Sequence, residues 1–198
     1  MMSQASNTIT VAYGTMMDRE SLGLAVGATR AACMEIKPVL VRGYRRVFNV
    51  VGSRYRPSHL LSEEPIEVGA ANVQRDPGSY FNAMALWVTS EELAILDGRE
   101  ASYARDSVDL EDFETGLPMS YGLIYVATPK SGRMMHDPKQ LLPRWRDICV
   151  ARAACYGWSK RFGEIYDQTS YLADGITLVA DRYPPEIVPR ESCPPPDE

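Results

Sequence analysis

Residues 9–17 read ITVAYGTMM and predict a β-strand that runs directly into a tight turn. Alternating β-branched and apolar residues over 9–13 are typical of a strand, and Gly14 allows the chain to turn where the strand ends. Successive backbone N–H groups at such a turn can hold a carboxylate or an oxyanion. The residues alone favour neither an anion-binding loop nor a plain turn.

Helix and strand signals continue on the C-terminal side of this turn. Asp18 is placed to cap a short helix over residues 19–26. Residues 39–51 predict a longer extended run, and residues 52–65, with two prolines and no sustained periodicity, predict a loop.

Residues 76–79 read DPGS, which is a turn signal between two apolar runs at 70–73 and 81–88. This arrangement predicts two strands paired through a turn. A capping box formed by Thr89 and Glu92 then begins a helix.

That helix is expected to stop at Gly98, just before Glu100. Two more strands are predicted over 103–110 and 118–128, joined by an acidic turn. Two helices follow, one opened by Pro143 and one over 160–172.

Several strands therefore precede two C-terminal helices, with connections too short for regular βαβ crossovers. We expect an α+β fold with a mixed or antiparallel sheet closed into a small barrel, flanked by helices. Residues 1–8 are expected to form a flexible lead, 9–180 a single domain, and 181–198 a tail. Six of the 14 prolines lie in that tail, which argues against regular structure there.

Composition narrows the function further. The 198 residues carry a net charge of −5, which opposes binding to nucleic acid and to anionic membranes. No apolar run approaches the roughly 18 residues of a membrane-spanning helix, and residues 1–10 lack a secretory signal, so we expect a soluble cytoplasmic protein. Four scattered cysteines and two isolated histidines predict reduced thiols and no metal site.

Four short motifs occur in a recognisable order. They are Tyr13, Gly14 and Thr15; NVQRDPGS at 72–79; LDGRE at 96–100 with Tyr103 beyond it; and Pro143, Arg144 and Trp145. Together, over residues 9–175, they resemble the gamma-glutamylcyclotransferase-like superfamily.

The resemblance implies an enzyme that releases 5-oxoproline without a cofactor from a small gamma-glutamyl dipeptide or gamma-glutamylamine. The position that matches the catalytic glutamate of the family is Glu100. The anion-holding loop and the pocket wall fall on further residues, namely Tyr13, Gly14, Thr15, Met16, Met17, Tyr103 and Trp145.

The reaction explains why a single carboxylate suffices. The attacking ammonium loses a proton and the leaving nitrogen gains one, so a group that accepts and then donates serves both steps. We expect a raised pKa at Glu100, because the negative end of a helix dipole and the neighbouring Asp97 both favour its protonated form.

Two residues depart from the family pattern. Ala101 stands where a glycine is usual, and would be strained if that position requires a positive φ. Trp145 stands where many members carry a tyrosine, which keeps an aromatic wall but removes a hydroxyl group.

Two other functions remain open. A catalytically silent module of the same fold would bind a small acid or a partner through the retained pocket. The run of arginines between residues 42 and 56, interleaved with tyrosines, is a candidate RNA surface, although a solvated strand face fits the acidic net charge better. Cys149 and Cys155 are interpreted as packing residues, and the oligomeric state is open.

Overall fold

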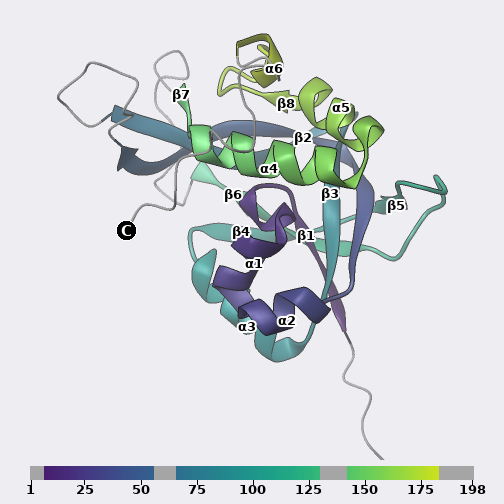
Figure 1. Ribbon diagram of the computed structural model, residues 1–198. Coiled ribbons are helices and arrows are strands. Elements are labelled where there is room, and N and C mark those ends of the chain that lie inside the picture. Colours follow the sequence, from purple (N-terminus) through teal and green to yellow (C-terminus); the bar gives the residue numbers. More distant parts are fainter. Residues whose placement is uncertain (1–6, 56–65, 130–141, 183–198) are drawn as a thin grey trace, which may run out of the picture.

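The computed structural model describes residues 7–55, 66–129 and 142–182 (Figure 1). The N-terminal half contains the strands β1 (Thr8–Ala12), β2 (Ile36–Tyr55) and β3 (Ile66–Val88), the 3₁₀ turn η1 (Thr15–Met17), and the helices α1 (Arg19–Val26), α2 (Ala28–Cys33) and α3 (Ser90–Arg99). The C-terminal half contains β4 (Tyr103–Val108), β5 (Leu110–Asp112), β6 (Gly122–Ala127), β7 (Leu142–Pro143) and β8 (Ser170–Tyr171), with α4 (Trp145–Trp158), α5 (Lys160–Gln168) and α6 (Val179–Arg182).

The strands form one mixed sheet in the order β4-β6-β1-β3-β2-β5, with β7 beside β3 and β8 beside β2. The pairs β1–β6, β2–β8 and β3–β7 are parallel, and the other pairs are antiparallel. The two strands at the ends of this order, β4 and β5, are separated in the chain by Asp109 alone. Because one residue cannot span a flat sheet, the sheet curls into a half-barrel, and the predicted α+β class is confirmed.

Both faces of the central strands are buried. Leu40, Met84 and Leu86 face a core shared with the helices, whereas Val39 and Ala85 face the interior of the half-barrel. This explains why these strands read as apolar runs instead of alternating with polar residues.

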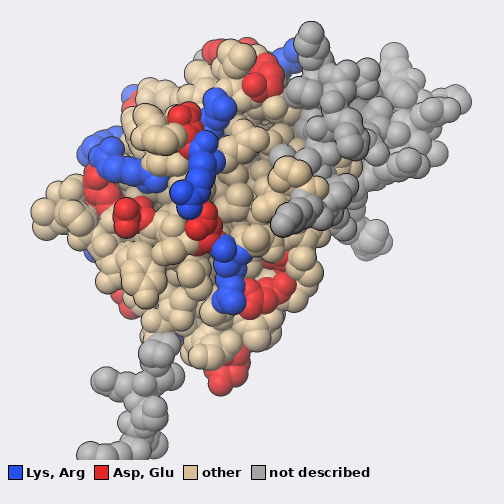
Figure 2. All heavy atoms as spheres, turned by 180° about the vertical axis from the view of Figure 1, so that it is seen from behind, with Lys and Arg blue, Asp and Glu red and all other residues tan. Residues whose placement is uncertain are grey.

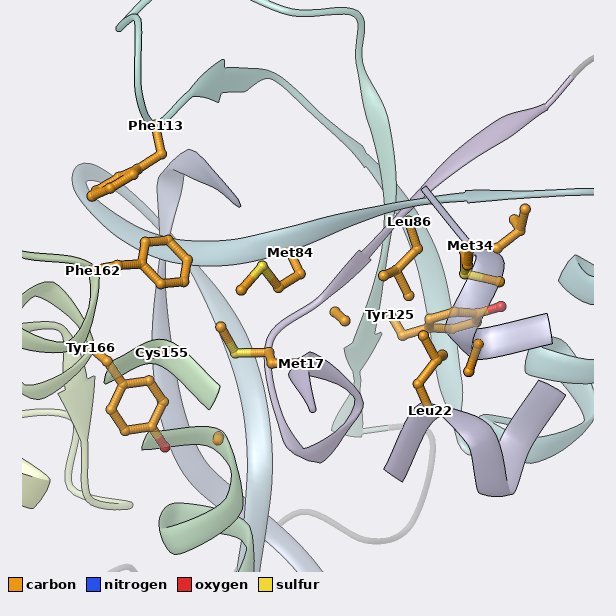
Figure 3. Packing of buried hydrophobic residues seen from close by; sticks show 14 of the residues in the cluster. Met17, Leu22, Met34, Met84, Leu86, Phe113, Tyr125, Cys155, Phe162 and Tyr166 are labelled. Carbon is orange, nitrogen blue, oxygen red and sulfur yellow. The ribbon is translucent and has the colours of Figure 1, made fainter. Parts of the chain in front are cut away.

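The core on the helix side combines aliphatic and aromatic residues with three methionines, whose flexible side chains adapt to irregular gaps. Figure 3 shows Met17, Met84 and Phe162 in this core, and the Phe113 and Phe162 rings meet edge to face with their centroids 4.8 Å apart. Cys149 and Cys155 are buried, as expected for packing residues.

Strand β3 corrects one prediction. The sequence DPGS at 76–79 does not separate two strands, because β3 runs unbroken from Ile66 to Val88 and pairs with β2 on both sides of it. Arg42 pairs with Tyr80 and Tyr44 with Arg75, so Gly43 alone lies opposite this four-residue excursion. Gly43 has φ of +78°, a conformation that glycine adopts readily, and the excursion is therefore a bulge inside the ladder.

Several element boundaries also differ from expectation. The capping box at Thr89 and Glu92 begins α3 as predicted, but the helix continues through Gly98 and ends at Arg99. Pro143 lies in β7, and α4 begins two residues later with Arg144 as its N-cap. Helix α5 ends at Gln168, because the next residues join β2 as strand β8.

The segment predicted as a tail begins within α6, which reaches Arg182; the rest of the tail and residues 1–6 lie outside the described residues. No helix in the described ranges is long and apolar enough to cross a membrane.

Candidate active site

A cleft of about 440 Å³ lies where the loop after β1, the end of α3 and the start of α4 come together. Six of the residues predicted from the sequence line it, namely Tyr13, Gly14, Thr15, Met16, Glu100 and Tyr103. They come from segments almost 90 residues apart in the chain, which β1 and the strands beside it bring together. The structure thus places most of the predicted site residues in one cavity.

The loop after β1 contains a single 3₁₀ turn, η1. The hydrogen bonds of this turn run from the Met17 N–H to the Gly14 carbonyl and from the Asp18 N–H to the Thr15 carbonyl, each 3.0 Å. The N–H groups of Thr15 and Met16 precede the first bond of this turn and have no acceptor within it. Gly14 lines the cleft with a negative φ, and a β-carbon at this position would lie 3.6 Å from the Ala71 β-carbon, an ordinary contact distance.

Glu100 is the C-cap of α3, and its side chain is 20% exposed at the cleft. Burial raises its pKa, and the Arg99 guanidinium, 3.4 Å from the carboxylate, partly opposes this rise in pKa. The direction matches the expectation, but the cause is loss of solvent and not Asp97. The Asp97 carboxylate instead accepts a hydrogen bond of 2.8 Å from the Tyr125 hydroxyl.

Ala101 carries no backbone strain. Within the described ranges, every residue with a positive φ is a glycine. The turn after Glu100 therefore accepts an alanine without the left-handed conformation that the family pattern suggested.

Two tyrosines pack beside the carboxylate. The Tyr13 hydroxyl donates to the Tyr125 carbonyl oxygen at 2.6 Å, and the Tyr103 hydroxyl donates to the Ala71 carbonyl oxygen at 3.3 Å. Burial raises the pKa of Tyr13 well above its ordinary value, and negative charge on Tyr103 and Glu100 raises it further. Tyr13 is therefore a neutral hydrogen-bond donor at neutral pH.

Two predicted residues stand apart from this group. Met17 is 4% exposed and packs in the core between the sheet and the helices, because the 3₁₀ turn rotates it away from Met16. Trp145 is the first residue of α4, and its side chain lies outside the described part of the structure.

The sequence reasoning missed three charged residues of the cleft wall: Arg99, Arg144 and Asp147. The Asp147 side chain is 13% exposed, and burial raises its pKa to about 6 although Arg144, Arg146 and Arg99 oppose the rise. Asp147 lies three residues after the N-cap of α4, a common place for an acidic residue in any helix. Its place in the sequence therefore gives no sign of a site, and only the packing of α4 beside the cleft shows that Asp147 belongs to the cleft wall.

In the described ranges, no group of three or more His, Cys, Asp or Glu side chains is close enough together to hold a metal ion.

The two described arginines of β2 that reach the surface, Arg42 and Arg45, lie beside acidic side chains. Arg42 pairs with Glu111 at 2.7 Å and Arg45 approaches Asp76 at 3.9 Å. On the face shown in Figure 2, Lys and Arg side chains lie beside Asp and Glu side chains.

Arg46 contradicts the interpretation of this run as a solvated face. It is fully buried, donates to Ser170 at 2.9 Å and stacks on the rings of Phe81 and Tyr166. The side chain of Arg54 and the whole of Arg56 lie outside the described part of the structure.

No protein-family model and no curated protein matches the sequence. Solved structures do match. A structure named gamma-glutamyl cyclotransferase is 14% identical with a TM-score of 0.56, covering 81% of this chain and 86% of its own. The human uncharacterized protein loc79017 is 15% identical with a TM-score of 0.55 and the same coverage. YkqA from Bacillus subtilis is 16% identical with a TM-score of 0.59, covering 80% of this chain and 52% of its own.

These similarities extend over about four-fifths of the chain, and at such low sequence identities they show a shared fold only. The chain has the gamma-glutamylcyclotransferase-like fold.

Proposed function

We propose that this protein is a cofactor-independent enzyme that releases 5-oxoproline from a small gamma-glutamyl dipeptide or gamma-glutamylamine. The observation that carries the proposal is a half-buried carboxyl group, Glu100, with a raised pKa in the same cleft as the Gly14 loop. The fold shared with a gamma-glutamyl cyclotransferase supports it.

The reaction moves two protons from the attacking nitrogen to the leaving nitrogen. Glu100 accepts the first from the substrate's α-ammonium, and the freed amine nitrogen attacks the gamma-carbonyl carbon. Glu100 donates this proton to the departing nitrogen as the original amide C–N bond breaks. It then takes the second proton from the nitrogen of the new ring and passes it to the released amine, which returns the carboxylate to its starting state. A pKa raised by burial brings Glu100 closer to the pH at which both transfers are efficient.

The loop after β1 is suited to the other charges of the substrate. The N–H groups of Thr15 and Met16 are donors for a carboxylate or for the oxyanion that develops on the attacked carbonyl. Such donors contribute most in a partly desolvated cleft, because hydrogen bonds there compete with less water.

The test is to incubate the purified protein with a panel of gamma-glutamyl dipeptides and gamma-glutamylamines and to measure 5-oxoproline. We expect product from at least one compound without added metal or nucleotide. Saturable binding of a panel member without product would indicate a silent binding module. Activity lost on chelation and restored by zinc would contradict the mechanism.

A further inference from the structure

Two arginine side chains are buried in the core where α4 and α5 pack against the sheet. Arg46 of β2 is fully buried, and Arg152 of α4 is 3% exposed. The Arg152 Nε atom donates to the Asp167 carboxylate at 2.6 Å, and the same carboxylate accepts the Tyr156 hydroxyl at 2.8 Å. A buried charge is costly unless an opposite charge pairs with it, so Arg152 is accounted for and Arg46 is the unusual member of the pair.

The described groups that contact the Arg46 guanidinium are neutral. It donates to the Asn82 carbonyl oxygen, to Asn82 Oδ1 at 3.3 Å and to Ser170 Oγ at 2.9 Å. The Phe81 and Tyr166 rings pack on it, with centroids 5.1 and 4.4 Å from its Cζ atom. Within residues 7–55, 66–129 and 142–182, no carboxylate forms an ion pair with Arg46.

The neighbouring weak acids do not supply the missing negative charge. Burial raises the pKa of the Cys155 thiol to about 12 and also raises the pKa of the Tyr166 hydroxyl, so both are neutral at neutral pH. Burial lowers the pKa of Arg46, but a guanidinium keeps its proton in proteins. Among the described residues, Arg46, Arg152 and Asp167 therefore leave one positive charge in the core without a partner.

Four hydrogen-bond donors in this part of the core have no acceptor among the described residues. They are the Arg46 Nε atom, both Arg152 Nη atoms and the Tyr166 hydroxyl. Figure 3 shows Tyr166 beside Cys155 in the core, and the charges of Arg46 and Arg152 oppose the rise in the Tyr166 pKa that burial causes. Both guanidinium groups are thus within electrostatic range of this hydroxyl, and donors from β2, α4 and α5 face one region.

We propose that Arg46, Arg152 and Tyr166 hold a small monovalent anion of the chloride class in the core between β2, α4 and α5. One negative charge balances the excess positive charge, and an ion that only accepts hydrogen bonds suits a set of unpartnered donors. The anion ties both helices to the long strand β2, so its effect is on the stability of this packing. The site is separate from the cleft and independent of the proposed function.

Chloride titration of the wild-type protein tests the proposal. Thermal melts are recorded while sodium chloride replaces sodium gluconate at constant ionic strength, because gluconate is too large for a packed core. A ligand that binds only the folded protein raises Tm, and each tenfold rise in chloride above its Kd should add about 3–5 °C for a chain of this size. A Tm that does not change with chloride would overturn the proposal.

Tyr166→Phe tests where the anion binds. The substitution removes one donor and none of the hydrogen bonds that the described residues make. The chloride concentration needed for a given rise in Tm should increase at least about tenfold, the scale of a hydrogen bond to a charged group. Tyr121→Phe is the matched control, because Tyr121 is 69% exposed, and it should titrate as the wild type does. An unchanged chloride response in Tyr166→Phe would show that chloride binds elsewhere and would overturn the assignment.

Crystals grown in sodium bromide provide a second test that needs no variant. Bromide shares the chemistry of chloride, and its anomalous scattering distinguishes it from water. We expect an anomalous peak within hydrogen-bond distance of the Tyr166 hydroxyl and of an Arg152 Nη atom. Water alone at this place would overturn the proposal.

Discussion

The proposed role of Glu100 in proton transfer can be tested by a substitution that keeps the shape of its side chain. Glu100→Gln retains hydrogen bonding but neither accepts nor delivers the transferred proton. Turnover should fall by at least about 100-fold, within the usual range for general acid–base catalysis, while substrate affinity and Tm stay near wild type. Steady-state assays of 5-oxoproline together with thermal melts measure both.

Glu91→Gln on the same helix serves as the control, because Glu91 is exposed in the first turn of α3. Turnover of Glu100→Gln within about tenfold of wild type would show that another group moves the proton. When the pH is lowered, kcat/KM of the wild type should begin to fall at a pH above the ordinary pKa range of a glutamate. The reason is that burial raises the pKa of Glu100, which must be ionised to act as the base.

Asp147 affects stability in a direction that can be worked out from its pKa. Its carboxyl group binds a proton more tightly when folded, with a pKa of about 6, than when unfolded. The stabilisation is therefore complete below the unfolded pKa and is lost as the pH rises through about 6. The facing charges of Arg99, Arg144 and Arg146 favour the ionised carboxylate and so oppose this rise in the pKa of Asp147.

Asp147→Asn removes this titration. The Tm of the variant relative to wild type should rise between pH 4.5 and pH 7.5, by the equivalent of about 3 kcal/mol at most. Thermal melts across that range provide the measurement. Parallel Tm curves for the two proteins would mean that Asp147 is solvated in the folded state.

At the scale of elements, Gly69 sets the approach of β7 and α4 to the sheet. A β-carbon at this position would overlap the backbone carbonyl of Phe48, which cannot move without disturbing β2. Gly69 also pairs with Pro143, and its carbonyl oxygen accepts the Arg144 N–H at 2.8 Å. This contact places the start of α4 at the cleft.

Gly69→Ala should therefore destabilise the protein by about 1–3 kcal/mol, the usual cost of forcing extra volume into a packed site. It should also lower activity, because Arg144 moves with the backbone. Gly78→Ala in the same strand is the control, since a β-carbon there meets no atom within 4 Å. Chemical denaturation of both variants gives the comparison, and equal midpoints would contradict the close approach at Gly69.

Element prediction succeeded where the signal is local. The side chains of Asp18 and Thr89 cap α1 and α3 as expected, because a cap depends on hydrogen bonds only three residues away. It failed at residues 76–79, where turn chemistry is present but the long partner strand β2 continues on both sides. Because β2 and β3 pair on both sides of these residues, the predicted turn forms a bulge within the paired strands.

At the scale of the whole molecule, the last described element is α6, which ends at Arg182 and packs against the body through the buried Val179. Truncation after Arg182 removes the proline-rich segment, whose prolines cannot donate ladder hydrogen bonds. The Tm should change by less than about 2 °C, which corresponds to under about 1 kcal/mol for a chain of this size, and activity should persist. A larger drop in Tm would show that the segment packs on the body.

The sequence by itself determined the α+β class, the loop at Gly14 and the place of Glu100 just after a helix. Strand alternation, helix caps and short motifs each depend on residues that are close together in the chain. Only the tertiary structure decided that Met17 enters the core, that Arg46 is buried, and that Arg99, Arg144 and Asp147 join the cleft. Those outcomes depend on which surfaces meet when the sheet curls and α4 packs against its central strands. Contacts of that kind join residues far apart in the chain, so no local pattern of side chains records them.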